Sequence, residues 1–345
     1  MNKRTFRWAR LAAVVAVLAI VAAACNSKGG GGGGTPSGGG SPSGGGTTTL
    51  KVAIVAPSAT NDLAFTQSMV DAVNSLKGSE NLEIAVSDNQ FVVDDAANAI
   101  RNYASQGYDL VIAHGSQYGG SVQQIAADFP DVSFAWGTAG DTFGMDNVFA
   151  YQAASDQGGY AQGVMAAELS TSGVIGVVGP IEVGDAKLYV DGFKAGAKAD
   201  KADIDVRVNY TGSFSDVNLA SAAAQSFVTA KADVMTGTAQ MVVGAIGVCK
   251  TANIPWFGTQ SNQASLAPTV VVSSQVYHWE VALKEIIDSI RAGTKGGKSF
   301  DINLENGGEV IEYNSSFDLS SDVKAKGDEA IAGIKDGSIQ TGVSA

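Results

Sequence analysis

The stretch GYDLVIAHGSQYGG, from Gly107 to Gly120, joins a short apolar run to a polar loop rich in glycine. Asp109–Ala113 predicts a buried strand, because its apolar residues follow one another without a polar break. His114–Gly120 then predicts the turn from that strand into a helix at 122–129. A strand, a polar loop and a helix in this order are typical of α/β proteins with parallel sheets.

The same unit recurs on both sides of this stretch. In the first half we predict four further strands, at Leu50–Val55, Leu82–Val86, Val132–Trp136 and Val148–Tyr151. After a helix at Tyr160–Leu169 the rhythm starts again, with strands at Val174–Val178, Ile204–Val208, Val234–Thr236 and Trp256–Gly258. Helical segments separate the strands, at 95–106, 122–129, 187–198, 218–229 and 241–251. Two lobes follow, each a mostly parallel sheet flanked by helices.

The last part of the folded chain adds a helix and two strands. Gly293 ends an amphipathic helix whose apolar residues recur at helical spacing: Trp279, Leu283, Ile286, Ile287 and Ile290. Phe300–Leu304 and Val310–Tyr313 predict the final strands, and a polar surface helix follows. Trp279 heads the apolar stripe, so we expect it in the core rather than against a ligand.

Polar and aromatic residues gather in the loops at the carboxyl ends of the predicted strands, where open α/β sheets bind ligands. The second half supplies Gly179–Glu182, Gly237–Gln240 and Thr259–Gln263. We expect the loops of the two lobes to face each other across a cleft that closes on a small molecule by a hinge motion. The candidate ligand-binding residues in these loops are Asp62, Phe65, Thr66, His114, Gly115, Ser116, Gln117, Thr138, Glu182, Thr238, Asn262 and Gln263.

Several candidates also have a purely structural interpretation. A helix after the first strand is predicted from the apolar face Met69, Val70, Val73 and Leu76. Asp62 is placed to cap this helix, and Phe65 to pack beneath it. His114 is interpreted either as a ligand contact or as part of the packing of its lobe. Gln117 and Tyr118 lie in a loop, where exposure alone explains them.

The first 25 residues indicate export. Basic residues precede an unbroken apolar run, Leu11–Ala24, which suits a signal-peptide core and is short for a membrane crossing. Small residues stand directly before Cys25, which resembles the lipobox of bacterial lipoproteins. We predict a signal peptide at 1–24, then a lipid-modified Cys25 and a flexible Gly/Ser-rich linker at 25–49. The alternative is ordinary secretion with a free Cys25 thiol.

Composition narrows the function classes. The chain has 34 acidic and 22 basic residues, a formal net charge of −12, which argues against a nucleic-acid partner. With two Cys and two His, we expect neither a metal site nor a disulfide framework. Cys249 lies in an apolar run and is predicted to be a small buried hydrophobe. No cofactor is indicated.

Catalytic signatures are absent from the sequence or stand in the wrong order. AGTKGGKS, Ala292–Ser299, fits a loose phosphate-binding loop. It follows a predicted helix and precedes a strand, the reverse of the order that such a loop needs. His114 and His278 are the candidate bases, and His278 beside Trp279 is more simply explained by capping or packing. We therefore predict a binding protein rather than an enzyme.

Five blocks of the chain resemble the basic-membrane-protein family of lipoprotein receptors, which serve ABC importers of purine nucleosides. The family pattern D-x-S-F-N appears as Asp62-Leu63-Ala64-Phe65-Thr66. The blocks GYDLVIAHGSQYGGSVQQIAADFPDVSFA, GVIGVVGPIEVGDAKLYVDGFKAGAKA and NYTGSFSD match in order and spacing. The last block is GTQSNQASLAPTVVVSSQVYHWEVALKEIIDSIRAGT. The resemblance covers about residues 50–315.

The resemblance implies a two-lobed type I periplasmic-binding fold whose lobes are joined by a multi-strand hinge. It divides the chain into a first lobe at 50–152 and 273–297, and a second lobe at 153–272 and 298–315. A C-terminal helix and tail at 316–345 follow.

The resemblance also implies roles for particular residues. Asp62 falls where the family has its loop aspartate, and Phe65 where an aromatic ring stacks on the purine. Phe214 falls near a second aromatic from the other lobe, with core packing as its alternative. Thr66 replaces an Asn of the family, and Asn262 replaces the Asp expected to bind ribose. A nucleoside is therefore one reading of the ligand, and a free base or another small polar ring stays open beside it.

The implied protein is a monomeric, lipid-anchored receptor on the extracytoplasmic face of the cell membrane, with ABC permease subunits as partners. A second hypothesis is a sensor of the same fold that acts through a membrane signalling partner. A third, an extracellular hydrolase, needs a base and a nucleophile that meet in the cleft.

Overall fold

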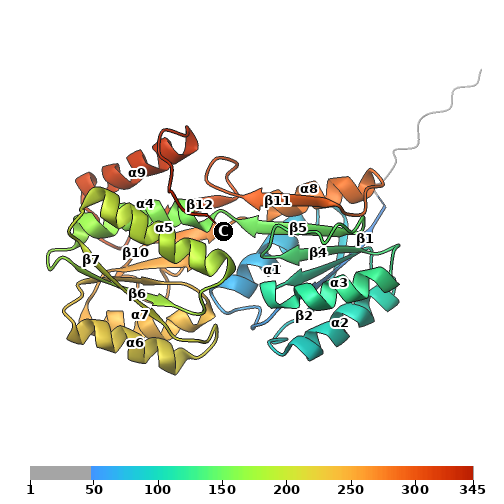
Figure 1. The fold of residues 1–345 in the computed structure, drawn as a ribbon, viewed down its shortest axis with the longest axis horizontal. Coiled ribbons are helices and arrows are strands. Elements are labelled where there is room, and N and C mark those ends of the chain that lie inside the picture. The colour runs from blue at the N-terminus through green and yellow to red at the C-terminus, as the bar shows by residue number, and fades with distance from the viewer. Residues whose placement is uncertain (1–47, 345) are drawn as a thin grey trace, which may run out of the picture. The chain divides into compact units, whose positions relative to one another are not determined.

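Two six-stranded sheets carry residues 48–344, the part of the chain that the computed structural model describes (Figure 1). The predicted signal peptide, Cys25 and the linker up to residue 47 lie outside the described residues. Strands alternate with helices along both halves of the chain. The predicted α/β class with two mostly parallel, helix-flanked sheets is confirmed.

The first sheet has the strand order β11-β5-β4-β3-β1-β2, and all its pairings are parallel. Helices α1 (Phe65–Leu76) and α8 (Glu280–Arg291) pack on one face, and α2 (Val93–Ser105) and α3 (Gly119–Asp128) pack on the other. We call this sheet and its helices the first lobe. Its strands and short 3-10 turn are β1 (Leu50–Val55), β2 (Leu82–Ser87), β3 (Leu110–His114), η1 (Ser116–Tyr118), β4 (Ser133–Gly137), β5 (Val148–Ala153) and β11 (Lys298–Ile302).

The second sheet has the order β12-β10-β9-β8-β6-β7, with one antiparallel pairing, between β10 and β12. Helices α4 (Ser155–Leu169), α5 (Gly184–Asp200) and α9 (Ser321–Lys335) cover one face, and α6 (Val217–Thr229) and α7 (Val243–Ala252) cover the other. We call this the second lobe. Its strands and 3-10 turn are β6 (Val174–Gly179), β7 (Asp205–Tyr210), β8 (Val234–Gly237), η2 (Gln240–Val242), β9 (Trp256–Gln260), β10 (Val271–Tyr277) and β12 (Glu309–Tyr313).

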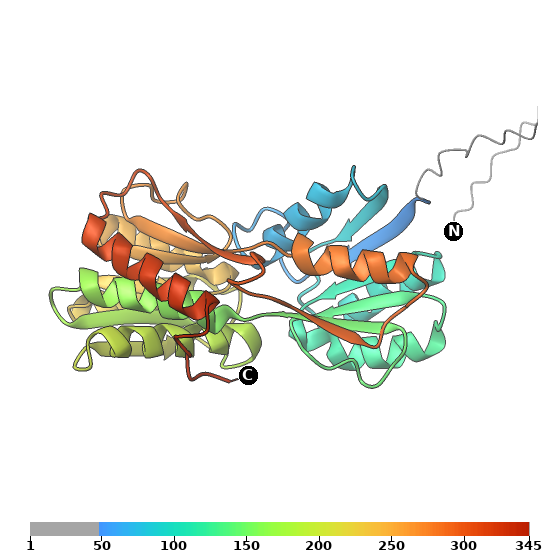
Figure 2. The ribbon, with the colours of Figure 1, turned by 90° about the horizontal axis from the view of Figure 1, so that it is seen from above.

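The chain passes between the lobes three times: from β5 to α4, from β10 to α8 and from β11 to β12 (Figure 2). These passages differ from the boundaries expected from the sequence. We expected the return to the first lobe at 273, but β10 stays in the second sheet up to Tyr277. We expected 298–315 in the second lobe, but β11 pairs with β5 of the first.

The two misplaced boundaries have local causes. Strand β10 was missed because Ser273, Ser274 and Gln275 interrupt its apolar run, although all three are buried. Their side chains are hydrogen bonded inside the lobe; for example, Ser274 Oγ accepts from the Gln263 backbone N–H at 3.0 Å. Strand β11 is an edge strand in which Phe300 packs against Phe149 of β5, with 6.0 Å between ring centroids.

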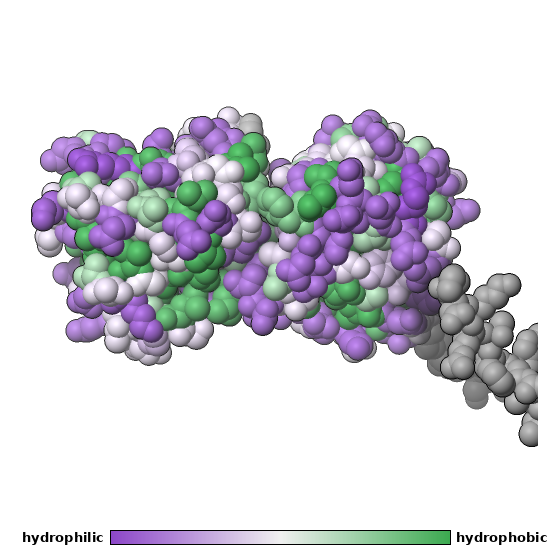
Figure 3. Space-filling view, turned by 90° about the horizontal axis from the view of Figure 1, so that it is seen from below, coloured by the Kyte–Doolittle hydropathy of each residue, from purple (hydrophilic) through white to green (hydrophobic). Residues whose placement is uncertain are grey.

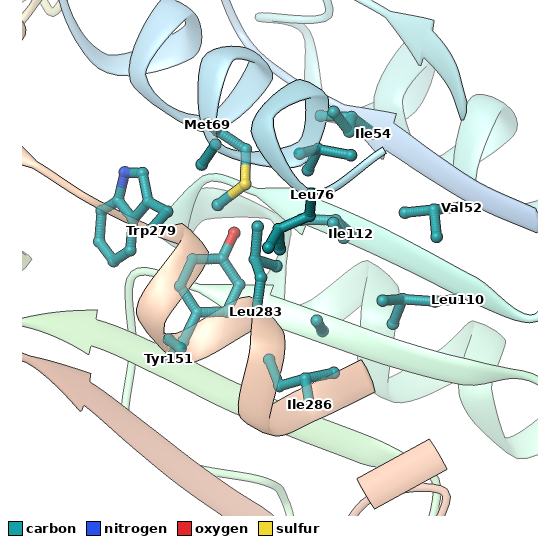
Figure 4. Close-up of a cluster of buried hydrophobic side chains, with 14 of the residues drawn as sticks. Val52, Ile54, Met69, Leu76, Leu110, Ile112, Tyr151, Trp279, Leu283 and Ile286 are labelled. Atoms are coloured by element: carbon teal, nitrogen blue, oxygen red, sulfur yellow. The ribbon is translucent and has the colours of Figure 1, made fainter. Parts of the chain in front are cut away.

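The largest core of the first lobe lies between its sheet, α1 and α8 (Figure 4). Trp279 is fully buried there beside Met69 and Tyr151, as the apolar stripe predicted. Its Nε1 donates to Ser68 Oγ at 3.0 Å, so the one polar atom of the ring is satisfied. In the second lobe Cys249 is buried and free, also as predicted.

Helices α4 and α5 pack with their backbones in near contact. A Cβ on Gly163 would overlap the Phe193 carbonyl oxygen, and a Cβ on Gly196 would overlap the Tyr160 carbonyl oxygen. Glycine is therefore needed for the packing of this helix pair. The close approach also joins the N-terminal ends of the two helices, where Ser155 Oγ donates to the backbone carbonyl of Asp185 at 2.7 Å.

Within residues 48–344, no helix combines the length and apolarity that a membrane crossing requires. On the face drawn in Figure 3, hydrophobic residues form separate patches among hydrophilic ones. Phe91, Val92 and Val183 are exposed hydrophobic residues in loops at the strand ends. Phe91 and Val183 also line the cavity described below.

Candidate functional site

A cavity lies between the two lobes, at the carboxyl ends of their strands. This position is the one that open α/β sheets use for ligands. The first lobe contributes Pro57, Phe65, Phe91, Gly115, Ser116, Gln117 and Thr138. The second lobe contributes Val183, Asp185, Ala186, Phe214, Ala239, Gln240 and Gln260.

Phe65 forms a rigid aromatic face on the first-lobe side. It begins α1, is 8% exposed and stacks on the His114 ring, with 3.8 Å between centroids and 12° between planes. His114 is fully buried behind it, and its Nε2–H donates to the Phe65 carbonyl at 3.1 Å. The other ring nitrogen, Nδ1, accepts from the Tyr151 hydroxyl at 2.8 Å. The structure thus places His114 in the support of Phe65 and outside the cavity lining.

Burial lowers the pKa of His114 to about 3, so its ring is neutral at physiological pH. The hydrogen-bond partners fix the tautomer, because a backbone carbonyl can only accept and Nε2 must therefore carry the hydrogen. Both ring nitrogens are already hydrogen bonded and the ring does not line the cavity, so His114 is not placed to act as a general base there.

Asp62 serves the helix that carries Phe65. Its carboxylate accepts from the backbone N–H groups of Ala64 at 2.9 Å and of Thr66 and Gln67 at 3.1 Å each. It also accepts from Ser58 Oγ at 2.6 Å. Thr66 is buried, and its hydroxyl bonds to the same serine. Neither Asp62 nor Thr66 is among the lining residues, and the hydrogen bonds that Asp62 accepts fit the capping interpretation.

The loop after β3 reaches the cavity as predicted from its position. Gly115, Ser116 and Gln117 all line it. A Cβ on Gly115 would lie 2.7 Å from the side-chain oxygen of Gln117 and 2.9 Å from the Tyr118 ring, so glycine lets this turn fold tightly. Tyr118 is fully buried rather than exposed, and its hydroxyl donates to the Gln90 carbonyl at 2.7 Å.

Four predicted residues of the second lobe lie outside the lining. Glu182 is exposed on its loop, and Thr238 is buried beneath Ala239. Asn262 turns away and donates to Glu312 at 2.6 Å. Gln263 is buried, where it accepts from Trp256 Nε1 at 3.1 Å. Phe214, by contrast, lines the same cavity as Phe65.

Direct hydrogen bonds join the lobes beside the cavity. Thr138 Oγ1 donates to Asp185 Oδ1 at 2.9 Å. Ser261 Oγ donates to the Ala64 carbonyl at 2.8 Å, next to the start of α1. Phe65 and Phe214 therefore lie on opposite lobes that are in direct contact beside the cavity.

Asp185 dominates the electrostatics of the cavity. Among the described residues that line it, Asp185 has the one charged side chain. Burial raises the pKa of this carboxyl, and the hydrogen bond from Thr138, the nearby backbone N–H groups and the nearby Gln260 amide oppose that rise. In residues 48–344, no group of three or more His, Cys, Asp or Glu is arranged to hold a metal ion.

Sequence reasoning missed eight of the lining residues, and the reason differs between loops. Ala239, Gln240 and Gln260 lie in loops that were recognised, but their neighbours were chosen. Asp185 follows Glu182 by three positions, between the predicted loop and the predicted helix at 187–198, and no role was predicted for it. Phe91 comes from the β2–α2 loop, where no pattern marked a site.

Comparison with known proteins identifies the family. Residues 49–340 match the model of the Bmp family, described as PnrA-like ABC transporter substrate-binding proteins. The chain belongs to this family. The resemblance found in the sequence is thus confirmed, and the Bmp family is one of substrate-binding proteins.

Relatives in the Bmp family carry informative names. The purine-binding protein of Brucella abortus is 26% identical over 84% of this chain and 82% of its own. The ABC transporter nucleoside-binding protein BmpA of Lactococcus lactis is 28% identical over 81% of this chain and 86% of its own. The transcriptional activator protein med of Bacillus subtilis is 26% identical over 77% of this chain and 82% of its own.

A solved structure agrees with the fold. An ABC transporter solute-binding protein from Conexibacter woesei is 25% identical, with a TM-score of 0.70. The likeness covers 84% of this chain and 98% of the other. The two-lobed arrangement is therefore that of a solute-binding protein.

Proposed function

We propose that this protein is the receptor of an ABC importer and binds a purine nucleoside, or a related small heterocycle, between its lobes. The observation that carries the proposal is the pairing of Phe65 and Phe214, from opposite lobes, on one cavity. Aromatic faces suit a flat ring, and each aromatic contact contributes about 0.5–1.5 kcal/mol beyond area burial. Relatives named for purine and nucleoside binding support the same ligand class.

The proposal includes an attachment to the membrane. Cys25 follows an export signal and small residues, so it is the expected site of lipid modification. The glycine-rich linker after Cys25 then tethers a monomeric receptor to the extracytoplasmic face of the membrane, close to its permease. Cys25→Ser should move the protein from the membrane fraction to the soluble fraction. A variant that stays with the membrane would contradict the lipid anchor.

Titration of the purified protein with ligands tests the binding function. Native mass spectrometry first identifies any molecule that co-purifies, and exhaustive dialysis removes it. Calorimetry with adenosine, guanosine, inosine and the free bases should then give saturable, one-to-one binding for at least one of them. Absence of saturable heat from the whole panel would reject the ligand class. Chemical conversion of a nucleoside on incubation would revive the hydrolase hypothesis.

One relative favours a second candidate function. The Bacillus subtilis protein carries the name of a transcriptional activator, which suits a sensor rather than an importer. The neighbouring genes on the chromosome distinguish the importer receptor from the sensor. Permease and ATPase genes support import, and a histidine kinase or chemoreceptor gene supports sensing.

A further inference from the structure

Two hydrogen-bond acceptors of the cavity have no partner among the residues that the structure describes. They are Asp185 Oδ2 and Gln260 Oε1, both buried atoms on side chains that line the cavity. Gln260 is only 3% exposed. Native proteins rarely leave buried acceptors unpaired, because desolvation without a new hydrogen bond is unfavourable. These two atoms therefore require an explanation.

The surroundings of Asp185 leave one of its two oxygens for a ligand. Oδ1 accepts from Thr138 Oγ1, which uses the hydrogen of that hydroxyl group. The carboxylate lies in the first turn of α5, where the positive end of the helix stabilises a negative charge. Local interactions thus hold the side chain in place, and Oδ2 has no hydrogen-bond partner among the described residues.

Backbone strain marks the same wall of the cavity. Gln260 has φ of +70° and Ala239 has φ of +77°, and both line the cavity. Residues other than glycine rarely adopt positive φ, and those that do gather at binding sites. Gln260 ends β9, so its conformation decides where the chain leaves the strand and where its amide side chain lies.

The charge of this wall limits what it can bind. It offers acceptors and one carboxylate, and no cationic side chain is found among the described lining residues. N–H and O–H groups of a neutral or cationic ligand complement such a surface. A phosphate group has acceptors and negative charge of its own, and the wall repels it.

We propose that Asp185 Oδ2 and Gln260 Oε1 together accept hydrogen bonds from donor groups of the ligand. This inference rests on the proposed function and narrows its ligand class. The ligand turns an amino group, a ring N–H or a ribose hydroxyl toward the second lobe. Nucleosides and bases meet this requirement, and their phosphorylated forms are disfavoured.

Calorimetric titration of Asp185→Asn with guanosine tests the pair. The oxygen of the asparagine side chain still accepts from Thr138. Its NH2 group takes the place of Oδ2 and the negative charge is lost, so a ligand donor loses its acceptor. We expect the affinity for guanosine to fall about tenfold or more. Asp203→Asn is the matched control, with the same charge change at an exposed site of the same lobe. It should leave the affinity unchanged.

Two analogues identify the donor. Inosine lacks the exocyclic amino group of guanosine, and 2′-deoxyguanosine lacks one ribose hydroxyl. The analogue that lacks the relevant donor should bind the wild type more weakly than guanosine does, and Asp185→Asn should abolish that difference. An equal loss for all three ligands in Asp185→Asn assigns the donor to the ring N–H. Unchanged guanosine affinity in Asp185→Asn would overturn the proposal.

The unfolding temperature without ligand separates the failure of this inference from the failure of the proposed function. A carboxylate kept for a ligand leaves the unfolding temperature unchanged or higher when it is replaced by Asn. A lower unfolding temperature would make Asp185 a structural bridge to Thr138 and overturn the proposal. If the wild type binds none of the nucleosides and bases, the proposed function fails, and the unfolding temperature still decides the role of Asp185.

Discussion

The two walls of the cavity differ in how completely their polar groups are paired. Behind Phe65, both ring nitrogens of His114 have partners, and the Asp62 carboxylate accepts four hydrogen bonds. On the opposite wall, Asp185 and Gln260 each keep a buried oxygen without a partner among the described residues. The backbone is strained there at Gln260 and Ala239.

This difference separates two tasks. In the first wall the polar groups behind Phe65 are all paired, and the Phe65 ring offers an aromatic face to any flat ligand ring. The second wall is incomplete until a ligand pairs its acceptors, so it is the wall that discriminates between ligands. Specificity should therefore change through the second lobe, and stability through the first.

The largest expected effect is on stability and comes from truncation of the first wall. Phe65→Ala removes a buried ring that stacks on His114 and should lower the free energy of unfolding by about 3 kcal/mol. Phe214→Ala is the matched control, because that ring is only half-buried. It should change stability by less than about 1 kcal/mol and still weaken binding roughly tenfold. Urea unfolding and calorimetry measure both quantities. Equal destabilisation by Phe65→Ala and Phe214→Ala would contradict the proposed difference between the two walls.

His114 makes the first lobe sensitive to acid. Its pKa of about 3 in the folded state lies below the ordinary value of 6.5. As the pH falls, His114 therefore binds a proton in the unfolded chain before it does so in the folded one. The contribution of His114 to the free energy of unfolding is full above pH 6.5 and is lost as the pH falls toward 3. From pH 7 to pH 5 this one group should cost about 2 kcal/mol of unfolding free energy. Urea unfolding at the two values should show a smaller loss in His114→Gln, and an identical loss would contradict the assignment.

Glu309 gives the second lobe the opposite response. Burial raises the pKa of this carboxyl well above its usual range, although the Gly158 backbone N–H donates to Oε1 at 2.6 Å. The folded state retains the proton, so stability is present below pH 4.5 and lost as the pH rises. Glu309→Gln should stabilise the protein at pH 7 by about 1 kcal/mol or more. Thermal unfolding at pH 7 and pH 4.5 checks this, and a variant that is less stable at pH 7 would refute it.

The smallest effect concerns the cap of α1. Asp62→Ala removes the acceptor for three backbone N–H groups and should cost about 1 kcal/mol of stability. Because the carboxylate does not line the cavity, ligand affinity should fall less than in Phe214→Ala. A loss of affinity larger than that of Phe214→Ala would restore Asp62 as a ligand contact.

Much of the fold was predictable because apolar runs and polar loops alternate so regularly. Strand β3 follows from the uninterrupted apolar run at its start, and β1 from an apolar run that contains one lysine. Strand β10 did not, because its buried serines and glutamine are satisfied by hydrogen bonds that only the tertiary structure supplies. The membership of β11 in the first sheet depends on a parallel pairing with β5, far away in sequence.

The site was predictable to the level of the loop and less so to the level of the residue. The direction of each side chain after a strand depends on one or two backbone angles. The positive φ of Gln260 turns the chain so that Gln260 lines the cavity and Asn262 reaches Glu312 instead. His114, at the end of β3, is hidden because the Phe65 ring covers it.

A crystal structure of the protein with its bound nucleoside tests the central claim most directly. We expect the base between Phe65 and Phe214, with a ligand N–H or O–H within hydrogen-bond distance of Asp185 Oδ2 or Gln260 Oε1. A ligand bound instead in the polar groove lined by Asn262, His278 and Glu312 would contradict it.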